Sequence, residues 1–369
     1  MALSQVGLER LGTSVTDKIG ERKNIVINGA MQVAQRGTSQ TGVNSSGYKD
    51  VCDRWRFNAS GANVGTYTVS QSTTSPDGFG NSLKIDCTTA RTPSNNELYE
   101  VEQRFEGQDL QVFAKGTSAT KKFSVSFYVK TNVSGNYVVW LYDADNNRNI
   151  GAVYTVSDSN WNRYTVSFPA DTTGGFDNDN ARSLDLRFVL LAGSDFTSGT
   201  LPTTAWESTS NANSRAGQTA NVASSTSNEW YLTGVQLEVG SVVTDFEHRS
   251  FAQELELCKR YYQQIDGDSD DYTGFPAYSE SATSMRVPVK IHPPMRAAFT
   301  VSKSGVFRFQ GATNDSAVSA AAFSLEGVNT SFNACTIRNT SYSGMAAADR
   351  PGNLQFMQDG SKLKFDAEL

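Results

Sequence analysis

Residues 121–130, KKFSVSFYVK, alternate between apolar and polar side chains at a period of two. The apolar members fall at every second position: Phe123, Val125, Phe127 and Val129. Successive side chains of a β-strand point to opposite faces, so this stretch predicts an antiparallel strand with one buried face. It therefore predicts a β-fold.

Similar strands surround this stretch. Residues 136–142 and 150–156 are apolar runs separated by turn formers, which predicts a hairpin. Residues 161–168, 183–191 and 229–239 continue the pattern, and the second of these places Leu184, Leu186, Phe188 and Leu190 inward. Because such strands fill residues 24–249 with no helical periodicity, the sequence predicts a large antiparallel jelly-roll sandwich.

One long connection interrupts the strands. Residues 207–228, ESTSNANSRAGQTANVASSTSN, contain hardly any large apolar side chain. Such a segment cannot pack a core by hydrophobic burial, and it reads as either a functional loop or a disordered one.

The pattern changes to a helix at Ser250, an N-cap residue with Gln253 three positions later. Four side chains then form one stripe: Phe251, Leu255, Cys258 and Tyr262. We expect a connecting helix over 250–264, whose stripe packs either against a sister subunit or against its own jelly roll.

Short strands resume after the acidic run at 266–271. In 284–291, SMRVPVKI, one face carries Met285, Val287, Val289 and Ile291. Further strands are expected within 298–303, 305–310, 333–339, 353–358 and 362–369. Residues 265–369 therefore predict a smaller C-terminal β-sandwich.

Residues 1–23 are predicted to be an arm. Their apolar stripe is thin and interrupted by glycines, and it consists of Leu8, Leu11, Val15 and Ile19. So short a segment cannot bury a core alone. The arm is either a frayed terminus or a peptide that docks onto a partner.

Composition excludes several classes. The chain has 369 residues, with 32 Lys and Arg against 38 Asp and Glu, a net charge of −6. This balance argues against nucleic-acid binding, which requires a basic surface. The sequence has no apolar run long enough to cross a membrane and no signal peptide at its start, so we expect a soluble protein.

We expect neither a metal nor a cofactor. Four cysteines, Cys52, Cys87, Cys258 and Cys335, lie far apart, which predicts buried thiols. The acidic runs at 143–147 and 266–270 have the alternate spacing of calcium loops but lack the glycine and closing glutamate, so they predict solvated turns.

No catalytic residue is expected either. The only histidines, His248 and His292, are not part of a nucleophile elbow or a zinc-binding helix motif. Carboxylate-pair hydrolysis of a glycan stays open, since it depends on spatial separation.

Four aromatic residues are candidates for sugar stacking because they lie among short strands and polar loops: Trp140, Tyr142, Trp161 and Trp206. The alternative is that they belong to the core, as aromatic residues of a β-domain often do.

Several strings resemble those shared by virion structural proteins of tailed bacteriophages. They are NIVINGAMQVAQRGTS (24–39), CDRWRF (52–57), QRFEGQDL (103–110), TGVQLEVGSVVTDFEHRS (233–250), ELELCKRYYQ (254–263) and FDAEL (365–369). This chain departs from many members by having only 23 residues, and no long repetitive stalk, before the first string.

The resemblance, together with the absence of a catalytic signature, implies a virion surface protein, assembled in the host cytoplasm: a tail fibre or host-attachment protein that binds cell-surface glycan without catalysis. It also implies a homotrimer with a jelly roll like that of carbohydrate-binding modules and a distal β-domain. The arm lies outside the resemblance, and we expect its four apolar residues to anchor the protein to other virion proteins. The alternatives are a capsid-decorating head fibre and a polysaccharide depolymerase.

Overall fold

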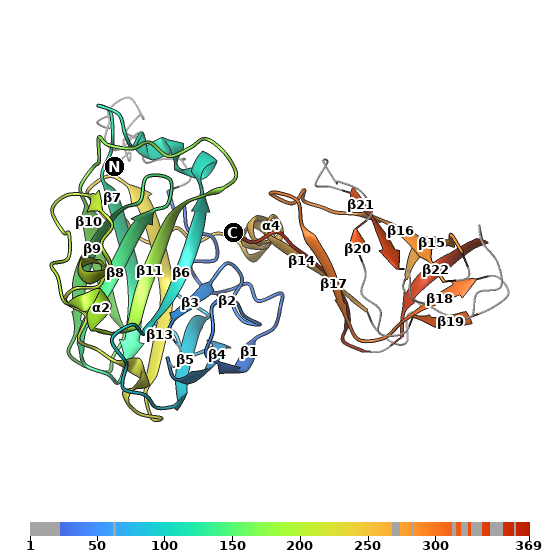
Figure 1. Cartoon of the computed structure of the whole chain (residues 1–369), viewed down its shortest axis with the longest axis horizontal. Helices are drawn as coiled ribbons and strands as arrows, with labels where there is room; N and C mark the ends of the chain where they lie inside the picture. Colours follow the sequence, from blue (N-terminus) through green and yellow to red (C-terminus); the bar gives the residue numbers. More distant parts are fainter. Residues whose placement is uncertain are drawn as a thin grey trace, which may run out of the picture. The chain divides into compact units, whose positions relative to one another are not determined.

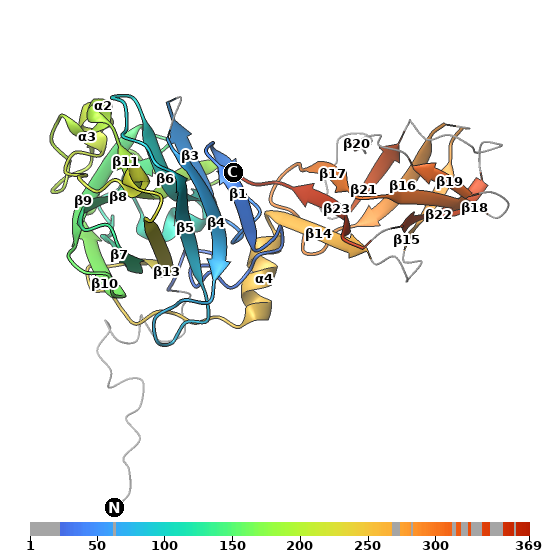
Figure 2. The ribbon, with the colours of Figure 1, turned by 90° about the horizontal axis from the view of Figure 1, so that it is seen from below.

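The structure, a computed structural model, describes residues 23–61, 64–267, 274–281, 283–311, 315–318, 324–325, 334–339, 350–357 and 359–369. The candidate anchor residues Leu8, Leu11, Val15 and Ile19 lie outside this range. Within it, none of the helices has the length and apolar character needed to cross a membrane. The chain divides into two compact units, drawn in Figures 1 and 2.

The first unit, residues 23–32, 40–47 and 55–249, is an antiparallel jelly-roll sandwich of two sheets. The six-stranded sheet has the order β1 (Ser39–Val43), β4 (Thr66–Ser72), β5 (Ser82–Thr89), β13 (Glu229–Val239), β7 (Phe123–Thr131) and β10 (Asn162–Phe168). The seven-stranded sheet has the order β12 (Glu207–Ser208), β9 (Arg148–Val156), β8 (Gly135–Asp143), β11 (Arg182–Ala192), β6 (Leu98–Glu106), β3 (Arg56–Ser60) and β2 (Gly47–Tyr48).

Aromatic side chains fill the space between the two sheets. Phe127 of β7 contacts Phe188 of β11 with ring centroids 4.9 Å apart and Tyr154 of β9 at 5.0 Å. All four apolar residues of the 121–130 stretch are buried. The predicted jelly-roll sandwich is thus confirmed, with the alternation of β7 setting its core face.

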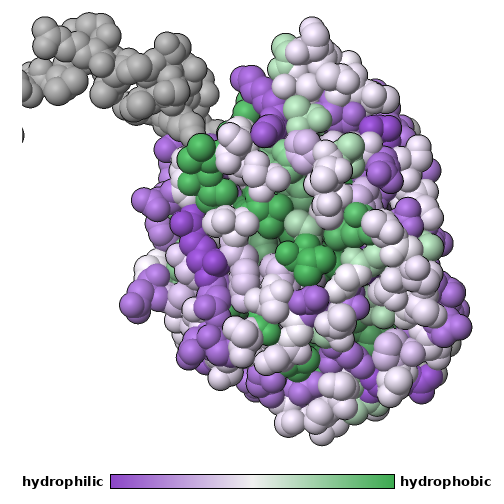
Figure 3. Space-filling view, turned by 90° about the vertical axis from the view of Figure 1, so that its left-hand side faces the viewer, coloured by the Kyte–Doolittle hydropathy of each residue, from purple (hydrophilic) through white to green (hydrophobic). Residues whose placement is uncertain are grey.

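The surface of this unit mixes polar and apolar residues. Figure 3 shows the side on which β9 and β10 lie in Figure 1, where apolar residues gather in the middle and polar residues border them. Only a few large apolar side chains of the described part of this unit are well exposed: Val112, Val153 and Val242.

The connection predicted at 207–228 is an ordered part of the fold. It contains β12, α3 (Asn211–Ser214) and η3 (Val222–Ser224), and α2 (Ser194–Thr197) precedes it. Arg215, Gln218 and Val222 are buried, so the expectation that this segment packs no core is wrong. It packs through polar contacts: the side-chain carbonyl of Gln218 accepts a hydrogen bond of 2.8 Å from the backbone N–H of Val138.

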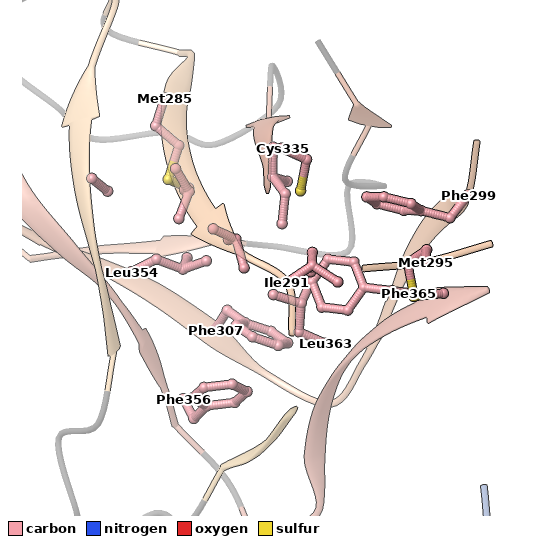
Figure 4. Close-up of a cluster of buried hydrophobic side chains, with 14 of the residues drawn as sticks. Met285, Ile291, Met295, Phe299, Phe307, Cys335, Leu354, Phe356, Leu363 and Phe365 are labelled. Carbon is pink, nitrogen blue, oxygen red and sulfur yellow. The ribbon is translucent and has the colours of Figure 1, made fainter. Parts of the chain in front are cut away.

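The second unit holds residues 33–39, 48–54 and the described part of 250–369. Its three-stranded sheet has the order β14 (Tyr262–Gly267), β23 (Ser361–Asp366) and β17 (Thr300–Ser304). Its seven-stranded sheet has the order β19 (Asp315–Val318), β18 (Phe307–Gly311), β22 (Arg350–Phe356), β15 (Gly274–Ser279), β16 (Met285–Lys290), β21 (Ala334–Asn339) and β20 (Ser324–Leu325). Apolar side chains from both sheets form one buried cluster (Figure 4), in which the ring centroid of Phe307 of β18 lies 4.9 Å from that of Phe356 of the neighbouring strand β22.

The predicted helix is present but shorter than expected. The capping box of Ser250 and Gln253 is formed, and α4 spans Phe251–Lys259. Tyr262 belongs to β14 instead, because it pairs with Asp366 of β23. Cys258 and Tyr262 are buried and Phe251 is 56% exposed, so the four residues do not form one exposed helical stripe for a sister subunit.

Two segments predicted to belong to the jelly roll, 33–39 and 48–54, pack with the second unit. Arg36 lies 3.7 Å from the ring centroid of Tyr262, and Arg54 lies 3.4 Å from that of Tyr261. Both arginines form ion pairs with the buried carboxylate of Glu368. We call these five residues the motif cluster, because each belongs to one of the strings that carry the resemblance.

Candidate functional site

The outward face of the seven-stranded sheet carries rows of polar side chains at matched positions. Arg56 of β3 pairs with Glu102 of β6, which pairs with Arg187 of β11, which pairs with Trp140 of β8. Phe188, the neighbour of Arg187, faces the other sheet, so this row points away from the sandwich core. Figure 1 shows these strands side by side.

A second row lies one pleat further along. Arg104 of β6, Asp185 of β11 and Tyr142 of β8 are register partners. We name the two rows together with their charged neighbours the arginine face. It consists of Arg56, Glu100, Glu102, Arg104, Trp140, Tyr142, Arg182, Asp185, Arg187 and Arg215.

Carboxylates and guanidinium groups alternate across this face. Glu102 contacts Arg56 at 2.5 Å, Arg104 at 2.9 Å and Arg187 at 2.9 Å. Arg187 in turn contacts Glu100 at 3.0 Å and Asp185 at 2.6 Å. Opposite charges on adjacent strands stabilise a sheet when they share a register, and here three strands contribute to one network.

The negatively and positively charged side chains of the arginine face differ in their exposure to solvent. The three carboxylates are fully buried, whereas the side chains of Arg56 and Arg104 are each 16% exposed and that of Arg182 is 30% exposed. Arg182 also pairs with Asp185, to which its Nε donates a hydrogen bond of 2.7 Å. The charged groups that this face exposes to solvent are therefore guanidinium groups, which are hydrogen-bond donors.

The arginines hold two of the buried carboxylates, Glu100 and Asp185, ionised. Burial favours a higher pKa for Glu100, but Arg215 and Arg187 outweigh it and lower the pKa below its usual range. Burial likewise opposes ionisation of Asp185, and Arg187 together with Arg182 lowers its pKa. Neither carboxyl group is a proton donor near neutral pH.

These pKa shifts make the stability of the first unit pH-dependent. A carboxyl group with a lowered folded-state pKa stabilises the fold above its unfolded pKa of about 4, and this contribution is lost as pH falls through the folded pKa. We expect the melting temperature of the first unit to drop as the pH falls below about 4. Tryptophan fluorescence measures it, since every tryptophan lies within 55–249. A profile that is flat to pH 2.5 would contradict the lowered pKa values.

Part of the arginine face is covered and part is open. Segment 194–218 packs Leu201 and Ala216 against Val138 and Trp140. From the same segment, Arg215 lies 3.6 Å from the ring centroid of Trp140 and pairs with Glu100. The open part contains Arg56, Arg104, Arg182 and the half-buried Tyr142, whose ring stacks on Trp140 at 5.2 Å and 10°.

The structure brings only two of the four predicted aromatic residues together. Trp140 and Tyr142 share the arginine face, but Trp140 is 3% exposed and its ring is covered by Arg215. Trp206 is 4% exposed, and its Nε1 donates to the carbonyl of Pro169 at 2.9 Å. Both tryptophans are buried, and the expectation that they stack on a sugar is wrong because neither ring is open to solvent.

Trp161 lies elsewhere. It directly precedes β10, and its ring centroid lies 6.1 Å from that of Tyr231 of β13, so it lies beside the six-stranded sheet. Of the predicted residues, Tyr142 alone combines partial exposure with a place on the arginine face. Its stacking on a sugar stays a prediction.

Sequence reasoning missed the charged members of the site. The available signal was charge at alternate positions, with Glu100, Glu102 and Arg104 on one strand and Asp185 and Arg187 on another. Such a pattern is typical of a solvated face. That these strands are neighbours in matching register depends on the topology, which the sequence pattern does not contain.

Within the described ranges, no group of three or more histidine, cysteine, aspartate and glutamate side chains could hold a metal ion. Asp143, from one of the two acidic runs, accepts a hydrogen bond of 2.6 Å from the buried ammonium of Lys115. The predicted buried thiols are confirmed, because all four cysteines are buried and none of them forms a disulfide.

No family model and no curated protein matches the chain. Among solved structures it is similar to the enzymatically active domain of tailspike protein 4 of bacteriophage CBA120, at 12% identity over 58% of this chain and 21% of that chain, with a TM-score of 0.29. It thus spans about a fifth of that chain.

Two carbohydrate-binding modules are also similar. A family 4 module has 12% identity over 57% of this chain and 97% of its own, with a TM-score of 0.29. The family 11 module of Clostridium thermocellum, in complex with a mixed-linked tetrasaccharide, has 11% identity over 57% of this chain and 99% of its own, with a TM-score of 0.26. At these values the similarities assign neither a family nor a ligand to this chain.

Proposed function

We propose that the protein is a non-catalytic virion surface component of a tailed bacteriophage, a tail fibre or host-attachment protein, which binds cell-surface glycan through the open part of the arginine face. One observation carries the binding site: a half-buried aromatic ring, Tyr142, lies among partly exposed guanidinium groups on the outward face of a rigid sheet. The virion role rests on the resemblance of the six sequence strings.

This combination suits a sugar. The ring of Tyr142 offers a flat apolar surface beside a polar edge, and such surfaces pack against the C–H faces of pyranose rings. Arg182 lies 5.5 Å from the same ring centroid, close enough to hydrogen-bond a group at the edge of a stacked sugar. Because both residues stand on strands, their geometry is set before the ligand arrives.

The charge state of the face favours binding without catalysis. Glycoside hydrolysis requires one carboxyl group that is protonated at neutral pH. On this face Glu100 and Asp185 have lowered pKa values and are paired with arginines. These two residues cannot supply the proton.

Replacing Tyr142 with alanine should weaken glycan binding about tenfold, since a lost aromatic contact costs about 1.5 kcal/mol. The measurement is binding of the full chain to a panel of bacterial capsular and lipopolysaccharide glycans. Trp161→Ala is the matched control, because it removes a partly exposed aromatic residue from the other sheet. Equal losses in the two variants would remove Tyr142 from the site.

Two further measurements separate the alternatives. New reducing ends in a glycan incubated with the protein would make it a depolymerase. Immunogold labelling of virions would place it on the tail, as we propose, or on the head, as a capsid-decorating fibre requires.

The homotrimer and the anchoring role of residues 1–23 stay predictions. Among the residues assigned to the trimer contact, only Phe251 and Leu255 have exposed surface to offer a sister subunit.

A further inference from the structure

We propose that the glycan recognised by this protein is acidic, and that Arg56 and Arg182 bind its carboxylate, sulfate or phosphate groups. The inference rests on the proposed function and adds the chemical class of the ligand. It starts from the distribution of charge and exposure over the arginine face.

The arginine face carries a local excess of positive charge, although the protein as a whole is acidic. Five guanidinium groups stand on it: Arg56, Arg104, Arg182, Arg187 and Arg215. The opposing carboxylates, Glu100, Glu102 and Asp185, number three, or four when Glu106 at the end of β6 is included. The whole chain carries a net charge of −6, so an excess of positive charge at one place is a local feature.

A ligand can contact this excess of positive charge, because the carboxylates are buried while several of the arginines are partly exposed. Glu100, Glu102, Asp185 and Glu106 are all fully buried, and the partly exposed charges are those of arginines. A neutral sugar presents hydroxyl groups, which both donate and accept, and a site for it normally offers both kinds of partner. The charged groups exposed on this face can only donate, which matches ligand groups that only accept.

The two arginines retain donors for this role. Arg182 uses Nε and Nη2 on Asp185, which leaves the N–H groups of Nη1. Arg56 uses Nη1 on Glu102, which leaves Nε and Nη2. A guanidinium group carries five N–H donors in a fixed plane and can bind a carboxylate or phosphate group through two parallel hydrogen bonds, in a bidentate pair.

The surrounding pairs allow these arginines to be replaced without breaking the network. When Arg56 is removed, Glu102 keeps Arg104 and Arg187. When Arg182 is removed, Asp185 keeps Arg187 at 2.6 Å. The double variant Arg56→Gln/Arg182→Gln is therefore expected to fold, and its tryptophan fluorescence melting curve checks this.

The experiment compares polygalacturonate with its fully methyl-esterified form, which has the same backbone without the charge. Dextran sulfate and dextran form a second pair, which separates sulfate from carboxylate recognition. The full chain is assayed at 50 mM and 500 mM NaCl, together with the double variant and with Lys122→Gln. The last variant removes one positive charge from an exposed position before β7.

We expect at least tenfold tighter binding to one charged polymer than to its neutral counterpart, weakening at high salt because exposed charges are screened. The double variant should lose at least tenfold and Lys122→Gln less than twofold. Equal binding to charged and neutral polymers, or an unchanged affinity of the double variant, overturns the inference and leaves glycan binding standing. If the chain binds none of these polymers and no glycan of the bacterial panel, both proposals fail.

Discussion

Replacing Glu368 with alanine will destabilise the second unit by about 3–5 kcal/mol. The carboxylate of Glu368 forms an ion pair with Arg54, whose side chain is buried against Tyr261. It also contacts Arg36 at 3.3 Å. Removing it leaves Arg54 charged and buried, because arginine does not lose its proton in proteins.

Asp366→Ala is the matched control. Asp366 also pairs with Arg36, at 3.2 Å, but its side chain is 42% exposed. An exposed ion pair contributes about 0–1 kcal/mol, so this variant should stay near wild type. The measurement is calorimetry together with tryptophan fluorescence, because the second unit contains no tryptophan and its transition is silent in fluorescence. A loss in Asp366→Ala as large as that in Glu368→Ala would contradict the role given to the buried pair.

Replacing Glu102 with glutamine will destabilise the first unit by about 3–5 kcal/mol. Glu102 is fully buried and forms ion pairs with three guanidinium groups, those of Arg56, Arg104 and Arg187. Glutamine has nearly the same shape, so the loss reports charge and not packing. Arg187 keeps Glu100 and Asp185, which sets an upper limit on the loss.

Glu229→Gln serves as the comparison for Glu102→Gln. Glu229 of β13 pairs with Lys84 at 2.5 Å, but its side chain is 40% exposed. The expected cost is about 1 kcal/mol or less. Urea unfolding followed by tryptophan fluorescence gives both free energies of unfolding. Similar values for the two variants would show that the arginine face does not depend on buried charge.

Local pattern was sufficient to predict the strands and the start of the helix. The alternation in 121–130 placed Phe123 and Phe127 in the core, and the Ser250 capping box fixed where α4 begins. The end of α4 was not predictable from the stripe that includes Tyr262. That residue pairs with β23 near the C-terminus, a contact about a hundred residues away in the sequence.

The site was less predictable than the fold. Trp140 was a candidate because of its residue type, but its ring is covered by Arg215, a residue in a segment without apolar periodicity. Pairing across β3, β6, β11 and β8 decides which charges meet, and register between distant strands leaves no local trace in the sequence.

The strings that carry the resemblance contribute mainly to the scaffold. Arg36, Arg54 and Glu368 come from three of them and meet in the motif cluster. Arg56 and Arg104 are the exceptions, since they lie in the strings CDRWRF and QRFEGQDL and belong to the arginine face. Tyr142 and Arg182 lie outside all of the strings, so the resemblance alone does not point to the binding site.

Glycan binding by the arginine face is tested most directly by comparing the wild-type chain with the variant Tyr142→Ala/Arg182→Gln on one array of bacterial surface polysaccharides. The account predicts that the wild type binds one or more acidic polysaccharides and that the variant loses that binding while its tryptophan fluorescence melting curve stays close to wild type. Binding that is equal in the two proteins, or absent in the wild type, would contradict it.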